Sequence, residues 1–145
     1  MARLRTLAEA IKTRLEEIPE LAGKVIVYRR KNIESEFQRR MEKASGKAVV
    51  IRLISAKNQA KANQKPRFAG TYTVTLFSHP ALTYKDTQAL DELLEEKIAP
   101  ALHGWWPEAI PSNGLIWCDT DTITFPDDPE FDVAVLTLQA PRTSS

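Results

Sequence analysis

The residues that could act as acids, bases or metal ligands are few in this sequence and stand far apart. His79 and His103 are the only histidines, and a proline or a glycine directly follows each. A histidine becomes a catalytic group or a metal ligand only when other polar side chains converge on it. A small hydrolase or nuclease that combines His79 with Asp119 or Asp121 is therefore one alternative. Loss of an activity on mutating one of these residues would reveal it.

An acidic stretch near the end of the sequence resembles a cation site only in composition. Clustered carboxylates bind calcium and magnesium, but an EF-hand loop needs a fixed spacing, a glycine and a final glutamate. The segment DTDTITFPDDPE has none of that order. The alternation of Asp119 and Asp121 is typical of the solvent face of a strand, and PDDP is typical of a turn. We expect no metal site in this stretch.

Other signatures of catalysis and of cofactor binding are also missing from the sequence. Cys118 is the only cysteine, which excludes an internal disulfide and a cysteine-based zinc site. There is no phosphate-binding glycine loop and no nucleophile elbow. No apolar run approaches the roughly 20 residues that cross a bilayer. We therefore predict a non-enzymatic protein with no cofactor and no membrane partner, in a reducing cytoplasm and without a secretory signal.

Charge is distributed unevenly along the chain. Residues 1–67 contain 17 Lys and Arg against 7 Asp and Glu, whereas residues 68–145 contain 3 against 12. The net charge of +1 therefore conceals a basic first half and an acidic second half. Opposite charges on one chain permit head-to-tail association between copies, unless the two halves intermix in space and cancel. The basic candidates for a partner surface are Arg29, Arg30, Lys31, Arg39, Arg40, Lys57, Lys61, Lys65 and Arg67.

The spacing of apolar residues predicts both helices and strands. Residues 3–18 have the three- and four-residue spacing of an amphipathic helix, and a second helix or helical excursion is expected within 32–45. A further helix is expected over 84–99, ended by Pro100. Strands are expected over 24–28, 47–54, 67–78, 115–125 and 130–140. This order predicts an α+β fold, with a mostly antiparallel sheet of four to five strands and two to three helices packed on one face.

A basic segment joins the strands expected over 47–54 and 67–78. We predict a long β-hairpin whose tip, residues 56–66, is a flexible basic arm in a single domain of residues 1–145. The tail, residues 141–145, is expected to be frayed. Trp105 and Trp106 either cover the core or lie in an interface, because tryptophan is frequent in both places. Asp127 and Asp128, in the turn PDDP, complete the predicted interface residues.

The order of elements resembles the tail terminator, or tail completion, proteins of long-tailed phages and prophages, the group of lambda minor tail protein U and its Mu-like equivalents. The likeness rests on an opening helix such as LRTLAEAIKTRLEEI, a short strand such as KVIVY and a long hairpin. A second helix such as TYKDTQALDELLEEKI and closing strands such as FDVAVLTLQA complete it. The basic segment 29–47 departs from that pattern.

The resemblance implies a structural role in the virion. Members of this family form rings, typically hexameric, on the last ring of the tail tube, end its polymerisation and present a surface to the neck. Expected partners are therefore further copies of this chain, the tail tube protein and the head–tail connector. The expected location is the virion tail, after assembly in the host cytoplasm. The alternative is a nucleic-acid-binding accessory protein that uses the basic 29–67 surface.

Overall fold

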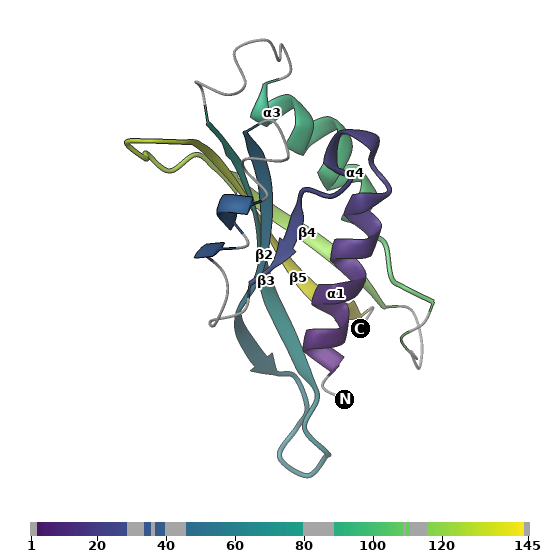
Figure 1. Ribbon diagram of the computed structural model, residues 1–145. Coiled ribbons are helices and arrows are strands. Elements are labelled where there is room, and N and C mark those ends of the chain that lie inside the picture. The colour runs from purple at the N-terminus through teal and green to yellow at the C-terminus, as the bar shows by residue number, and fades with distance from the viewer. Residues whose placement is uncertain are drawn as a thin grey trace.

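One five-stranded sheet forms the centre of the protein, as a computed structural model shows for residues 3–28, 34–35, 37–39, 46–79, 89–108, 110 and 116–143 (Figure 1). The strand order is β1-β2-β3-β5-β4; β1 pairs with β2 in parallel and every other pair is antiparallel. The expected α+β fold with a mostly antiparallel sheet is confirmed. The strands are β1 (Val25–Val27), β2 (Lys47–Asn58), β3 (Phe68–Ser78), β4 (Ile116–Thr124) and β5 (Asp132–Thr143).

Two helical segments cover one face of this sheet (Figure 1). The first is α1 (Arg3–Glu16), followed by the 3-10 turn η1 (Pro19–Leu21). The second runs from α3 (Leu90–Leu93) through η2 (Leu94–Ile98) into α4 (Ala99–Leu102). The helical spacing of apolar residues in α1 places its buried side chains in one stripe against the sheet. These are Leu7, Ala8, Ile11 and Leu15.

The alternating pattern of β3 separates the two faces of the sheet. Tyr72, Val74 and Leu76 are fully buried beneath the helices. The threonines between them lie on the opposite face, where they are half-buried. On β5 the same alternation places Leu136 and Leu138 opposite Val74 and Tyr72 in the core. The alternation in sequence thus determines which face is buried, because successive strand side chains point to opposite sides.

The second helical segment continues past Pro100, whereas a helix ending at that proline was expected. Proline lacks an N–H and crowds the carbonyl four residues before it, which usually ends an α-helix. Here the preceding turn, η2, widens to π geometry, and the Ala99 N–H donates to the Leu94 carbonyl oxygen. The widened turn accommodates the proline, and the helix continues to Leu102. The expected start of this helix at residue 84 lies outside the described residues.

Several strand bounds also differ from those expected. β2 extends to Asn58, so residues 56–58 of the predicted arm are part of the sheet. β5 extends to Thr143, so residues 141–143 do not form a frayed tail, because they pair with the start of β4. Of the expected helix within 32–45, the structure describes 34–35 and 37–39, which are helical. The rest of that segment, including Arg40, and Arg29, Arg30 and Lys31 before it lie outside the described residues.

Candidate interaction surfaces

The hairpin formed by β2 and β3 projects beyond the helices (Figure 1). Residues 47–51 of β2 are buried, whereas 52–58 are exposed. The boundary falls where β1 ends, because Val27 pairs with Ile51 and, among the described residues, no strand pairs with β2 on that side beyond this point. We call residues 53–68 the hairpin arm. Its strands remain paired as far as Asn58 and Phe68.

The tip of the hairpin arm is closed by its own hydrogen bonds. The Asn58 Oδ1 atom accepts from the backbone N–H groups of Ala60 (3.0 Å) and Arg67 (3.1 Å). The Lys61 N–H donates to the Gln64 Oε1 atom (3.2 Å), and the Gln64 N–H donates to the Lys61 carbonyl oxygen (2.9 Å). Amide side chains thus supply the turn contacts in a tip that contains no glycine. Their pairing leaves the lysine side chains directed to solvent along the tip.

The charge on the hairpin arm is entirely positive. Lys57, Lys61, Lys65 and Arg67 are exposed, and residues 53–68 contain no Asp or Glu. The ion pairs between described residues involve α1, His79 and His103, and none involves these four cations. The hairpin arm therefore presents four cations that the described part of the chain leaves unneutralised.

The hairpin arm also exposes apolar side chains. The exposed fractions are 38% for Leu53, 52% for Ile54 and 48% for Phe68. Among the described residues, one other large apolar side chain, Phe125, is exposed to this degree, at 59%. The register of β2 against β3 shifts between Leu53 and Ser55, so Ile54 lies in a bulge. Phe68 and the buried Tyr72 have equivalent places in the alternation of β3, but Phe68 lies in the part of the strand that the helices leave exposed.

The base of the hairpin arm is anchored to α1 through Gly70 and Tyr72. The Tyr72 hydroxyl donates to the Leu4 carbonyl oxygen at 2.7 Å, and burial raises the pKa of this phenol well above its ordinary value. A Cβ on Gly70 would lie 2.7 Å from Tyr72 Cε1, 2.9 Å from Leu53 Cδ1 and 3.0 Å from Leu4 Cδ2. The absence of a side chain at Gly70 therefore allows close packing here.

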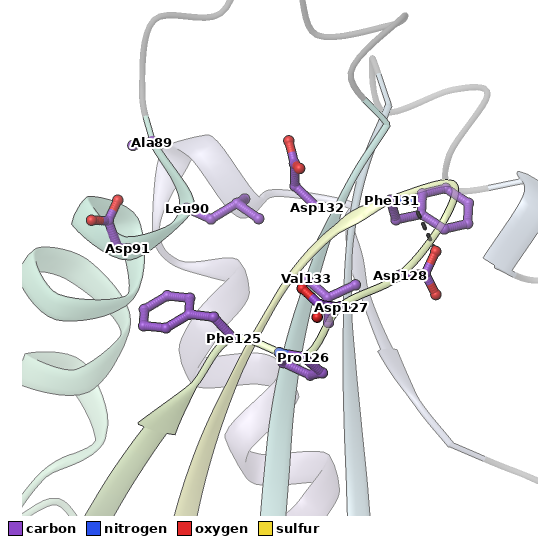
Figure 2. A pocket seen from close by; sticks show the side chains of 10 residues that line it. All are labelled: Ala89, Leu90, Asp91, Phe125, Pro126, Asp127, Asp128, Phe131, Asp132 and Val133. Atoms are coloured by element: carbon purple, nitrogen blue, oxygen red, sulfur yellow. Dashed lines mark hydrogen bonds between the residues drawn. The ribbon is translucent and has the colours of Figure 1, made fainter.

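A second surface lies at the turn between β4 and β5. Figure 2 shows a groove between this turn and the start of α3, with Leu90 and Asp91 on one side and Phe125 and Pro126 opposite. Its volume is about 560 Å³. Four carboxylates and no cation line it, together with apolar side chains. The lining residues are Ala89, Leu90, Asp91, Phe125, Pro126, Asp127, Asp128, Phe131, Asp132 and Val133; we call this the acidic groove.

Asp128 fixes the conformation of the turn at the acidic groove. Its Oδ1 atom accepts from the backbone N–H groups of Glu130 (2.9 Å) and Phe131 (2.9 Å). These two hydrogen bonds hold the pKa of the Asp128 carboxyl below its ordinary value, and the bond from Glu130 has the larger effect. Asp127 beside it is exposed. Asp128 therefore stays ionised near neutral pH.

The hairpin arm and the acidic groove lie at opposite ends of the same strand pair. Phe68 begins β3 at the arm, whereas Ser78 at the other end of β3 pairs with Asp132 of the groove. The strand rise of about 3.3 Å per residue separates the two ends by roughly 33 Å. The basic hairpin arm and the acidic groove are thus well separated in space, and the hairpin arm cannot reach its own groove.

The structure separates His79 from the acidic strand residues and places His103 beside one of them. His79 follows β3 and lies 3.9 Å from Glu130, and its ring contacts Phe131. His103 lies at the other end of the sheet, where its Nδ1 atom accepts from the Thr120 N–H at 3.3 Å and lies 4.0 Å from Asp119 Oδ1. Asp119 of β4 pairs with Gln139 of β5, which in turn pairs with Thr71 of β3. Thr71 is seven residues along β3 from Ser78, the residue that precedes His79. The structure therefore does not bring His79 to Asp119.

The two adjacent tryptophans pack against α1. Trp105 and Trp106 are half-buried. The Arg14 guanidinium lies 5.5 Å from the Trp105 ring and that of Arg3 lies 5.5 Å from the Trp106 ring. The Trp106 Nε1–H donates to the Ile110 carbonyl oxygen at 3.1 Å. These contacts fit a lid on the core, the first of the two roles expected for the pair.

The remaining candidates have simple surroundings. Cys118 is fully buried in β4, and burial raises the pKa of its thiol to about 12. Arg39 is exposed on the short helical segment beside Phe37. Among the residues that the structure describes, no group of three His, Cys, Asp or Glu side chains could hold a metal ion. Nor does any helix among them have the length and apolar character to cross a membrane.

No protein-family model matches this chain, and no curated protein matches it.

Two parts of these surfaces were missing from the sequence-based prediction. One is the apolar set on the hairpin arm, because nothing in RFAGTYTVTLFS indicates where the covering helices stop. The other is the groove around Phe125, which joins residues about 35 positions apart in the chain. A weak signal existed in TFPDDPEF, where an aromatic residue stands immediately before a proline-rich turn.

Proposed function

We propose that this chain is a structural virion assembly protein, a phage or prophage tail terminator. In this role copies of the chain form a ring that caps the tail tube, ends tube polymerisation and joins the tail to the neck. The observation that carries the proposal is the presence of a basic hairpin arm and an acidic groove at opposite ends of one sheet. A ring of identical subunits requires two different, complementary surfaces on each copy.

The arrangement of elements supports the same proposal. An opening helix, a short strand, a long hairpin, a second helical segment and a closing hairpin follow one another in the structure. This is the order on which the resemblance to tail terminators rests. The projecting hairpin arm adds a surface outside the core that can contact a neighbouring copy, the tail tube or the neck.

Tail tube polymerisation tests the proposal. The tube protein encoded in the same genome is polymerised with and without this chain, and tube length and tube ends are examined by negative-stain electron microscopy. We expect shorter tubes with an additional ring at one end. A variant with Lys57, Lys61 and Lys65 changed to Ser is expected to cap tubes less well. Unaltered tube lengths with bare ends at a molar excess of the chain would contradict the proposal.

The unneutralised cations of the hairpin arm favour one second candidate, an accessory protein that binds nucleic acid. Lysine and arginine contacts to phosphates make affinity fall steeply with salt. Outside the arm, the Arg52 guanidinium lies 4.4 Å from the Tyr28 ring, so one aromatic residue accompanies the basic surface. Fluorescence anisotropy with single-stranded and duplex DNA across a salt series separates the two functions. Affinity that falls steeply with salt and is lost in the three-lysine variant would favour this second candidate.

A further inference from the structure

We propose that the acidic groove of one copy receives the hairpin arm of the next copy. This inference rests on the proposed function, because it names the contact through which the ring forms. Both surfaces have the same two components, charge of a single sign and exposed apolar side chains. The following observations connect them.

Charge complementarity is the first observation. The hairpin arm carries Lys57, Lys61, Lys65 and Arg67 and no carboxylate. The acidic groove carries four carboxylates and no cation: Asp91, Asp127, Asp128 and Asp132. Complementary surfaces of this kind accelerate encounter and disfavour the wrong pairings, arm against arm and groove against groove.

Apolar complementarity is the second observation. The four exposed large apolar side chains of the described residues divide between these two surfaces, with Leu53, Ile54 and Phe68 on the hairpin arm and Phe125 in the acidic groove. Exposed apolar side chains gathered at two charged surfaces mark contact sites more often than isolated ones do. Burying Phe68 against Phe125 would give the contact an apolar centre inside a charged rim, as in stable interfaces.

Geometry makes the contact intermolecular. The two surfaces are separated by about ten strand residues, or roughly 33 Å, at opposite ends of β3. The base of the hairpin arm is fixed by the packing of Gly70, Tyr72 and Leu4, so the arm cannot fold back along the sheet. Each copy therefore donates one arm and receives another, which is a heterologous contact that propagates until it closes.

A charge-swap experiment tests the docking. The arm variant carries Lys57→Glu, Lys61→Glu and Lys65→Glu, and the groove variant carries Asp91→Lys, Asp127→Lys and Asp132→Lys. Asp128 is left in place because it holds the turn. The control variant carries Glu95→Lys and Glu96→Lys, which reverse two exposed carboxylates that follow Asp91 in the helical segment but do not line the groove. Masses are measured by light scattering at low salt after circular dichroism has shown that each variant is folded.

We expect the arm variant and the groove variant each to raise the concentration needed for self-association by roughly tenfold or more, which corresponds to about 1.4 kcal/mol. An equimolar mixture of the two is expected to associate again, because the acidic arm then meets the basic groove. The control variant is expected to associate like the unaltered chain. Phe68→Ser and Phe125→Ser, which replace exposed side chains, are expected to weaken association without loss of folding.

Three outcomes overturn the docking. The first is that both charge variants associate as strongly as the unaltered chain. If the unaltered chain also caps tubes, this outcome rejects the docking but not the proposed role in tail termination. The second is loss of tube capping by the groove variant with its self-association unchanged, which assigns the groove to the tube protein. The third is failure of the mixture to associate although each variant is folded. If the equimolar mixture associates again but the unaltered chain does not cap tubes, the docking stands and the proposed function alone is contradicted.

Discussion

Gly70→Ala tests how the hairpin arm is anchored to the body of the protein. The added Cβ would lie 2.7 Å from Tyr72 Cε1 and within 3.0 Å of Leu53 Cδ1 and Leu4 Cδ2. Real Cβ contacts are almost never this short, so at least one neighbour must move. Tyr72 is the least able to do so, because its ring is fully buried and its hydroxyl is bonded to the Leu4 carbonyl oxygen.

The magnitude follows from two opposing effects. Overpacking a buried site costs about 1–3 kcal/mol. Replacing glycine with alanine restricts the unfolded chain and returns about 0.4–1 kcal/mol. We therefore expect the free energy of unfolding to fall by about 1–2 kcal/mol, which lowers the melting temperature by on the order of 5 °C. The measurement is urea unfolding followed by tryptophan fluorescence and circular dichroism.

Two variants identify the cause of the loss. Leu53→Ala removes one of the three close atoms from an exposed side chain, so the double variant is expected to recover part of the loss caused by Gly70→Ala. Gly104→Ala is the control, because space there is open and its φ of +74° makes the cost a backbone cost alone. A Gly70→Ala protein at least as stable as the unaltered chain would refute the reasoning, as would a complete lack of coupling to Leu53.

Three further predictions concern single groups. Tyr72→Phe is expected to lower the free energy of unfolding by about 0.5–1.5 kcal/mol in urea titrations, because the hydroxyl loses its bond to Leu4; an unchanged midpoint would contradict this. The pKa of Cys118 is raised to about 12 by burial, so its thiolate forms more readily in the unfolded chain, and stability falls as pH rises above the ordinary value of 9.0. Cys118→Ala should flatten that fall, and Ellman's reagent should label the thiol slowly until the protein is unfolded. Asp128→Ala is expected to destabilise the β4–β5 turn, whereas Asp128→Asn keeps an Oδ1 atom that can accept both hydrogen bonds. Because the pKa of Asp128 is lowered in the folded state, its charge stabilises the fold above the ordinary value of 3.8, and this contribution is lost as pH falls through the folded pKa. The difference between Asp and Asn in pH-dependent thermal melts should therefore vanish in acid, and a constant difference would contradict the assignment.

Much of the fold follows from local pattern. The spacing of Leu7, Ile11 and Leu15 specifies α1 and its buried face, and the alternation from Thr71 to Leu76 specifies β3 and its two faces. Those patterns are properties of consecutive residues, so sequence alone contains them. The long hairpin between β2 and β3 was predictable for the same reason, since two strand patterns flank one polar segment.

What could not be predicted depends on distant contacts. A proline usually ends an α-helix, and nothing local in the sequence indicates that a π turn would accommodate Pro100. Phe68 has the register of a buried residue, but its exposure depends on where α1 and β1 stop. The acidic groove joins Asp91 to Asp127 through the packing of α3 beside β5. The sequence showed the imbalance of charge between the two halves of the chain, and the fold places the basic hairpin arm and the acidic groove at opposite ends of the sheet.

The mass distribution in solution tests the central claim, that copies of this chain associate head to tail into a closed ring. Native mass spectrometry and light scattering would follow the 16.3 kDa chain across concentration at low and high salt. The account predicts association that rises with concentration, stops at one closed oligomer with six copies as the expected size, and weakens at high salt. A monomer under every condition, or growth into polymers without an end point, would contradict it.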